Sequence, residues 1–217
     1  MGNVTYFLKN QLARLLYATG IVDRKMRAIP SDSFIVLMYH RVLPADMVDD
    51  IVQPGMYVLP ETLEQHLLYL ADRFDICAID EIGKPRVDRK RPGCLITFDD
   101  GWYDFYAYAF PVLQKYGVPA TVFLPTGFIG TNKMFWTDRL AILLKNAPAE
   151  TVRSKSVCQE NPALEVIRSY RGKLSKRIEL SIEYLKQKNC ETIERVLNEL
   201  SESTSVNDRN CRVFMTW

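Results

Sequence analysis

The fold is decided by residues 94–101, which read Cys94-Leu95-Ile96-Thr97-Phe98-Asp99-Asp100-Gly101. The first five residues form a short apolar and β-branched run, which predicts a strand buried on both faces. Asp99, Asp100 and Gly101 then predict a sharp turn, because glycine adopts backbone conformations that other residues avoid. In parallel α/β proteins, sites are built at this carboxyl end of the strands. The stretch therefore predicts a buried strand with a site at its end.

Regular patterns extend outward from this stretch on both sides. Two further apolar runs predict buried strands at residues 34–39 and 120–124. Apolar residues at helical spacing predict one helix over residues 60–74 and another over residues 102–116, which ends at Gly117. Strand, helix and strand joined by short connections form a right-handed parallel crossover, so the sequence predicts an α/β fold.

The two ends of the chain have a different character. Residues 1–30 predict an amphipathic helix over residues 7–19, followed by a linker that begins at Asp23. Residues 31–217 are expected to form the main domain. Within it, helical periodicity without any buried-strand pattern predicts a helical insertion after the third strand, at about residues 138–210.

Composition and charge argue against several classes of protein. The net charge of +2 over 217 residues is too small to indicate a nucleic-acid partner. No apolar run approaches the roughly 20 residues of a transmembrane helix, and the first residues lack a signal-peptide core. Five cysteines without C-x-x-C spacing suit reduced thiols. We therefore expect a cytoplasmic protein by default, without a transmembrane segment.

The N-terminal segment is locally basic. Up to Pro30 it contains Asp23 as its one acidic residue and has an excess of four positive charges, from Lys9, Arg14, Arg24, Lys25 and Arg27. Two interpretations fit this excess: a weak contact of the N-terminal helix with an anionic membrane surface, or a solvated helix face. The sequence favours the solvated face.

Two successive carboxylates at the end of a buried strand are unusual, because each resists burial unless it is paired, hydrogen-bonded or bound to a metal. A turn at Gly101 allows both to face one cleft, where one could hold a divalent cation and the other act as a general base. The alternative is structural: one carboxylate caps the following helix and the other faces solvent. The apolar strand before the turn favours the chemical interpretation.

The stretch Thr97-Phe98-Asp99-Asp100-Gly101 resembles the first motif, TFDDG, of the polysaccharide deacetylases, carbohydrate esterase family four. Other segments resemble the same family in the same order along the chain, over about residues 34–145. They are Val36-Leu37-Met38-Tyr39-His40-Arg41-Val42, Gly55-Met56-Tyr57-Val58 with Pro60-Glu61-Thr62-Leu63, Tyr116-Gly117-Val118-Pro119-Ala120-Thr121-Val122-Phe123, and Phe135-Trp136.

The resemblance implies a distorted (β/α) barrel, present in part, and hydrolysis of N-acetyl groups on a polysaccharide substrate. Carried over by position, Asp99 would be the catalytic base and Asp100 a ligand of a divalent metal such as zinc. His40, at the end of the first strand, and Trp102, after the glycine, are candidate substrate-binding residues. Packing inside the core is the alternative for both of them.

The family's other metal ligands and its general acid are histidines that come later in the chain, in part from an H-x-x-x-H motif. This sequence has two histidines, His40 and His66, and neither belongs to such a motif. Residues 213–217 resemble the segment that leads into it. We therefore expect a truncated product or a partial gene model, and the alternative is a deliberately shortened family member. For the function, the alternative to a deacetylase is a non-catalytic or unstable remnant. Glycoside hydrolysis by Asp99 and Asp100 ranks lower, because that chemistry needs carboxyl groups about 5 Å or more apart.

Overall fold

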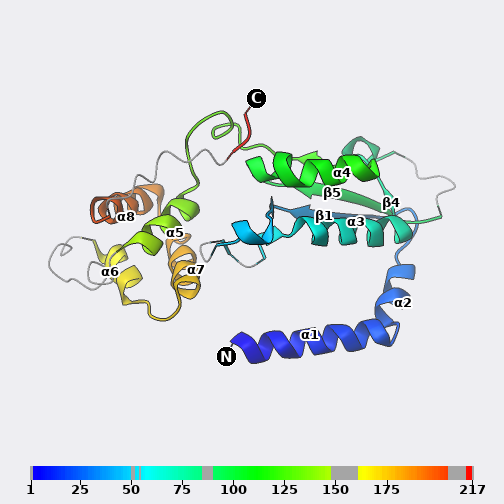
Figure 1. Cartoon of the computed structure of the whole chain (residues 1–217), viewed down its shortest axis with the longest axis horizontal. Helices are drawn as coiled ribbons and strands as arrows, with labels where there is room; N and C mark the ends of the chain where they lie inside the picture. The colour runs from blue at the N-terminus through cyan, green and yellow to red at the C-terminus, as the bar shows by residue number, and fades with distance from the viewer. Residues whose placement is uncertain are drawn as a thin grey trace. The chain divides into compact units, whose positions relative to one another are not determined.

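The computed structural model describes residues 2–49, 52–53, 55–84, 90–147, 161–204 and 214–216 (Figure 1). The chain forms two units, which are described separately. The first consists of residues 1–38, 64–97 and 113–121, and the second of residues 39–63, 98–112 and 122–217. The predicted boundary at residue 30 and the status of residues 138–210 as an insertion stay predictions.

The central strand β5 (Gly93–Phe98) is the predicted buried strand, and all six of its residues are buried. It belongs to a four-stranded sheet in which β1 (Phe34–Tyr39) and β4 (Asp75–Ile76) flank β5, and β6 (Thr121–Val122) also pairs with β5. The pairing of β4 with β5 is parallel. This mixed helix-and-strand architecture with parallel pairing confirms the predicted α/β class.

The prediction of full burial is wrong for the other two predicted strands. In β1, Val36 is 57% exposed and Met38 is 60% exposed, so that one face of the strand is open. β6 spans two residues instead of five, and Phe123 and Leu124 after it are exposed. An apolar run indicates a strand, but burial of both faces also requires a neighbouring layer, which the described residues do not supply here.

The two helices predicted over residues 60–74 and 102–116 are both present. Helix α3 (Pro60–Arg73) places Leu63, Leu67 and Leu70 in buried positions. After the turn at Gly101, a π-helical segment, η3 (Phe105–Ala109), continues into α4 (Phe110–Tyr116). The chain then leaves the helix at Gly117, whose φ is 60°.

The N-terminal segment contains two helices, α1 (Gly2–Ala18) and α2 (Ile21–Arg27), in contact with each other. The linker predicted from Asp23 is therefore wrong, because α2 occupies its first part. Gly20 separates the helices with a φ of 70°, a conformation that lets the chain change direction. Seven residues are too few to show a clear helical period in the sequence.

The second unit begins with a short parallel pair, β2 (Arg41–Val42) and β3 (Tyr57–Val58). Its helical part contains four helices around one apolar core. Among the described residues from Pro125 to Thr204 there is no strand, as expected. The helices are α5 (Trp136–Asn146), α6 (Pro162–Ser169), α7 (Leu174–Leu185) and α8 (Cys190–Glu202). Short 3₁₀ turns, η1 (Ala45–Met47) and η2 (Ile79–Glu81), complete the elements of the two units.

Candidate active site

The candidate site begins where β5 ends. The backbone N–H of Asp99 donates to the carbonyl of Tyr39 at 2.9 Å, so that β1 and β5 end side by side. Asp100 then has a φ of 75°, the one positive value outside glycine among the described residues. Left-handed backbone at a non-glycine residue is strained, and such strain is concentrated at functional turns. The turn therefore holds Asp100 in an orientation that an ordinary strand end would not give.

Gly101 is required in this turn for two reasons. Its φ of 58° lies in the region that favours glycine. A Cβ atom at this position would also lie 2.7 Å from Leu124 Cδ2 and 2.9 Å from Ile129 Cδ1. On its other side, the Gly101 carbonyl accepts a hydrogen bond from the backbone N–H of Met215 at 3.0 Å. The turn is thus enclosed by side chains and by a neighbouring backbone segment.

Asp100 lines a cavity of about 210 Å³ within the second unit. Trp102, Arg41, Asp138 and Lys186 also line it, together with apolar and uncharged side chains. The indole Nε1 of Trp102 donates to Asp100 Oδ2 at 3.3 Å, which orients that carboxylate. The cavity therefore combines two carboxylates and two cations in a partly enclosed space.

Arg41 is the central cation of this arrangement. Its Nε donates to Asp104 Oδ2 at 2.8 Å, and the backbone N–H of Val42 donates to Asp104 Oδ1 at 2.9 Å. The Arg41 guanidinium also lies 4.4 Å from the centre of the Trp102 ring. Burial raises the pKa of Asp104, while Arg41 and the Val42 N–H act in the opposite direction. Asp104 is thus a buried anchor that fixes Arg41 beside the cavity.

Asp138, in the first turn of α5, is a second carboxylate of the cavity that the sequence reasoning missed. Burial raises the pKa of Asp138 to about 6, and the negative charge of Asp100 adds to this increase. Arg41 and a hydrogen bond from Thr137 Oγ1 at 3.4 Å act in the opposite direction. An acidic residue in a helix's first turn is common, so Asp138 carries no signal of a site in the sequence.

Trp102 occupies a packed aromatic cluster. It is 3% exposed, and its ring stacks on Phe214 with centres 4.8 Å apart and meets the edge of Phe135 at 5.6 Å. Phe214 and Trp102 also form an isolated antiparallel bridge. Substrate binding and core packing were the two expectations for Trp102, and the structure shows it packed in the core. Contact of Trp102 with a substrate stays a prediction, although part of its surface faces the cavity.

His40, Asp99 and His66 lie outside the 210 Å³ cavity. His40 directly follows β1 and is half-buried, so it reaches the same end of the sheet as Asp99. Neither His40 nor Asp99 is among the residues that line the 210 Å³ cavity. His66 lies on the exposed side of α3. The structure thus brings Asp100 and Trp102 into one cavity and leaves Asp99 and His40 at the adjoining strand ends.

The fit of these residues to a metal ion is incomplete. Within the described part of the chain, no group of three or more histidine, cysteine, aspartate or glutamate side chains could hold a metal. Transition-metal sites in proteins need three or four such ligands. Asp100 could supply one ligand, but a full site would need ligands from outside the described residues.

Comparison with known proteins shows that part of the chain is similar to one protein family. Residues 86–160 match the family model for polysaccharide deacetylases. The matched segment contains β5, the Asp99–Gly101 turn and Asp138, so both carboxylates of the cavity lie in the part of the chain that is similar to this family.

Two curated proteins are similar in sequence to this chain over part of their length. YxkH of Bacillus subtilis, whose name assigns it to the polysaccharide deacetylases, is 33% identical over 99 residues, which are 44% of this chain and 33% of that protein. Poly-beta-1,6-N-acetyl-D-glucosamine N-deacetylase of Staphylococcus epidermidis is 30% identical over 128 residues, which are 54% of this chain and 44% of that protein. The chain thus matches less than half the length of these relatives.

A solved structure is also similar in part. The structure of IcaB from Ammonifex degensii has a TM-score of 0.40 and 20% identity, over 78% of this chain and 81% of that one. A TM-score of this size does not establish a shared barrel, and the similarity of the segment to the family rests on the sequence matches.

Proposed function

We propose that the chain supplies the aspartates of a metal-dependent carbohydrate N-deacetylase, with Asp99 as the base and Asp100 as a metal ligand. The observation that carries the proposal is the left-handed Asp100, at the end of a fully buried strand, inside sequence of the deacetylase family. A distorted (β/α) barrel is part of the proposal, because β4, β5 and the crossover through α4 to β6 have the order of such a fold.

The reaction would hydrolyse an acetamide on a sugar. A water oxygen bonds to the acetyl carbon while Asp99 takes the proton of that water, and the carbon–nitrogen bond then breaks. The leaving nitrogen takes up a proton, and acetate and a free amine result. The turn would serve this step by holding Asp99 and Asp100 at one strand end, next to the Arg41 guanidinium.

The proposal includes a metal ion, although the described residues do not form a complete metal site. A divalent ion such as zinc would take Asp100 as one ligand and its remaining ligands from elsewhere. The first substrate to test is poly-β-1,6-N-acetylglucosamine, because the Staphylococcus epidermidis relative is named for it. Chitin oligomers and peptidoglycan are the alternatives.

Acetate release from these three polymers tests the proposal, with zinc added and after treatment with a chelator. Asp99→Asn should lower the rate about 10²-fold to 10⁴-fold, the usual contribution of a general base. Asp80→Asn, at an exposed ion pair with Lys84, is the matched control and should leave the rate unchanged. Equal rates for Asp99→Asn and the unchanged protein would remove Asp99 from the mechanism.

A second candidate function is non-catalytic. It is favoured by the absence of a three-ligand metal group among the described residues. A single carboxylate ligand binds zinc weakly, since the number of ligands sets the affinity. Calorimetric titration with zinc separates the two candidates: micromolar or tighter binding that Asp100→Asn abolishes would contradict the non-catalytic one.

A further inference from the structure

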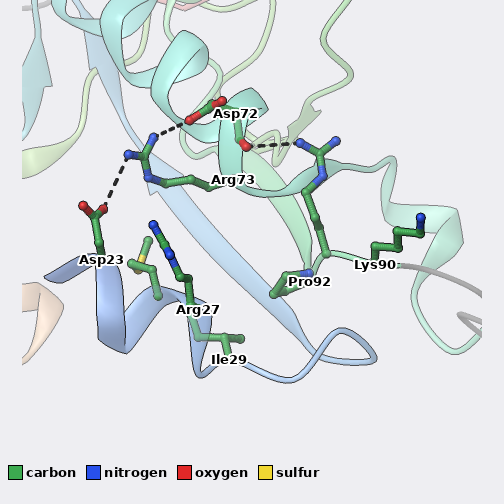
Figure 2. Close-up of a pocket in the computed structure, with 9 residues that line it drawn as sticks. Asp23, Arg27, Ile29, Asp72, Arg73, Lys90 and Pro92 are labelled. Carbon is green, nitrogen blue, oxygen red and sulfur yellow. Dashed lines mark hydrogen bonds and ion pairs between the residues drawn. The ribbon is translucent and has the colours of Figure 1, made fainter. Parts of the chain in front are cut away.

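A basic pocket of about 350 Å³ lies in the first unit and shares no lining residue with the 210 Å³ cavity (Figure 2). It is formed by α2, the end of α3 and the segment before β5. Four of its lining residues are cationic and two are acidic, a local excess of two positive charges. The cations are Arg27, Arg73, Lys90 and Arg91, and the acids are Asp23 and Asp72.

Two of the four cations are already engaged. Arg73 bridges Asp72 at 2.9 Å and Asp23 at 3.5 Å, and thereby occupies both acids of the pocket (Figure 2). Arg91 pairs with Asp75 at 3.0 Å and donates to the carbonyl of Ala71 at 2.9 Å. These contacts hold the wall of the pocket in place. Both acids that line the pocket are paired with Arg73, so neither is left to pair with the other lining cations.

Arg27 and Lys90 are the two cations that remain. Both side chains are exposed, and neither forms an ion pair or hydrogen bond with another residue in the described ranges. Exposed cations on two segments of one pocket attract anionic groups such as phosphates. The chemistry of the pocket thus fits a phosphate.

The helix that precedes the pocket adds an apolar surface. Leu8, Leu12 and Leu15 lie along one face of α1, four and three residues apart, and are 60%, 56% and 60% exposed. The turn at Gly20 connects this helix to α2, whose last turn contains Arg24, Lys25 and Arg27. Within the described residues, no helix is both long and apolar enough to cross a bilayer.

We propose that α1 and the basic pocket together dock the chain on an anionic lipid bilayer. The leucines of α1 enter the acyl boundary, and the cations of α2 and the pocket face the headgroups. Arg27 and Lys90 add positive charge to this face. An exposed leucine stripe, together with cations that have no acidic partner among the described residues, has the charge complementarity to an anionic lipid surface that either feature alone lacks. This inference is independent of the catalytic proposal.

Co-sedimentation of the full chain with lipid vesicles tests the docking. Binding should be strong to vesicles of phosphatidylcholine with 30% phosphatidylglycerol, at least tenfold weaker to phosphatidylcholine alone, and weakened again by 0.5 M salt. The double variant Arg27→Glu/Lys90→Glu should weaken binding to the anionic vesicles about tenfold or more. Leu8→Ser/Leu12→Ser should also weaken it, with salt dependence retained.

The matched control reverses two exposed lysines of the second unit, in Lys176→Glu/Lys188→Glu, which changes the net charge equally. If this control weakens vesicle binding as much as Arg27→Glu/Lys90→Glu does, the attraction is general and the pocket has no part in it. Two other outcomes also overturn the proposal: inorganic phosphate bound in the pocket without any vesicle binding, and leucine variants that abolish self-association in sedimentation velocity but leave vesicle binding intact.

Discussion

The basic pocket of the first unit and the 210 Å³ cavity of the second use charge in opposite ways. In the second unit, Arg41 is held by the buried Asp104, and Asp100 accepts from Trp102, so these groups have partners within the fold. In the first unit, Arg27 and Lys90 have none among the described residues. Partnered, buried charges hold a geometry, whereas exposed, unpartnered ones remain available to a ligand. Substitutions of the partnered charges in the second unit should therefore affect stability, and substitutions of Arg27 and Lys90 in the first unit should affect binding.

The largest expected effect on stability comes from Asp104→Ala. This change leaves the Arg41 guanidinium and the Val42 N–H without the carboxylate that both contact. Breaking a buried ion pair from one side costs about 3 to 5 kcal/mol, because the remaining charge stays poorly solvated. Urea denaturation measures the loss. A loss below about 1 kcal/mol would mean that Arg41 finds solvent and that the pair does not anchor the cavity.

The next effect concerns the turn itself. Gly101→Ala should cost about 2 kcal/mol, because it adds left-handed strain and a Cβ less than 3 Å from Leu124 and Ile129. Gly117→Ala separates the two causes, since Gly117 has a similar φ of 60° but open space around it, and it should cost about 1 kcal/mol. Gly127→Ala, with neither feature, should be neutral. Equal losses at Gly101 and Gly117 would remove the steric part of the argument.

The third effect depends on pH and arises at Asp138. Its pKa of about 6 in the folded protein exceeds the usual value near 3.8, so the folded state binds more protons than the unfolded state between these two pH values. Folding stability should therefore fall as the pH rises from about 4 to about 6, by at most about 3 kcal/mol. Asp138→Asn, measured with a chelator present, should lack this decrease. The same pH dependence in both proteins would contradict the assignment.

The sequence predicted the backbone of the site better than its surroundings. β5 was predictable because its side chains are apolar on both faces, and the aspartates follow directly. The Arg41–Asp104 pair was not, because its members are 63 positions apart and only the fold brings them together. The left-handed Asp100 also depends on contacts beyond the turn, since Asp-Asp-Gly alone is compatible with several turn types.

Burial was the least predictable property. Residues 34–39 and 94–98 are both continuous apolar runs, yet Val36 and Met38 are exposed while every residue of β5 is buried. The difference lies in the layers that cover the sheet, since both faces of β5 are covered while Val36 and Met38 on one face of β1 are left open by the described residues. A local pattern reports that a strand forms, but its neighbours decide which faces are covered.

The smallest effects separate the cations of the basic pocket from one another. Arg73→Ala removes two ion pairs and the contact of the guanidinium with the Tyr69 ring at 3.9 Å, and should cost about 0.5 to 1 kcal/mol. Lys90→Ala removes no contact among the described residues and should leave the urea midpoint unchanged. If Lys90→Ala were as costly as Arg73→Ala, Lys90 would be a structural residue and its charge would not be available to an anion. If it is neutral, any loss of vesicle binding on charge reversal at Lys90 reflects the bound surface and not a weakened fold.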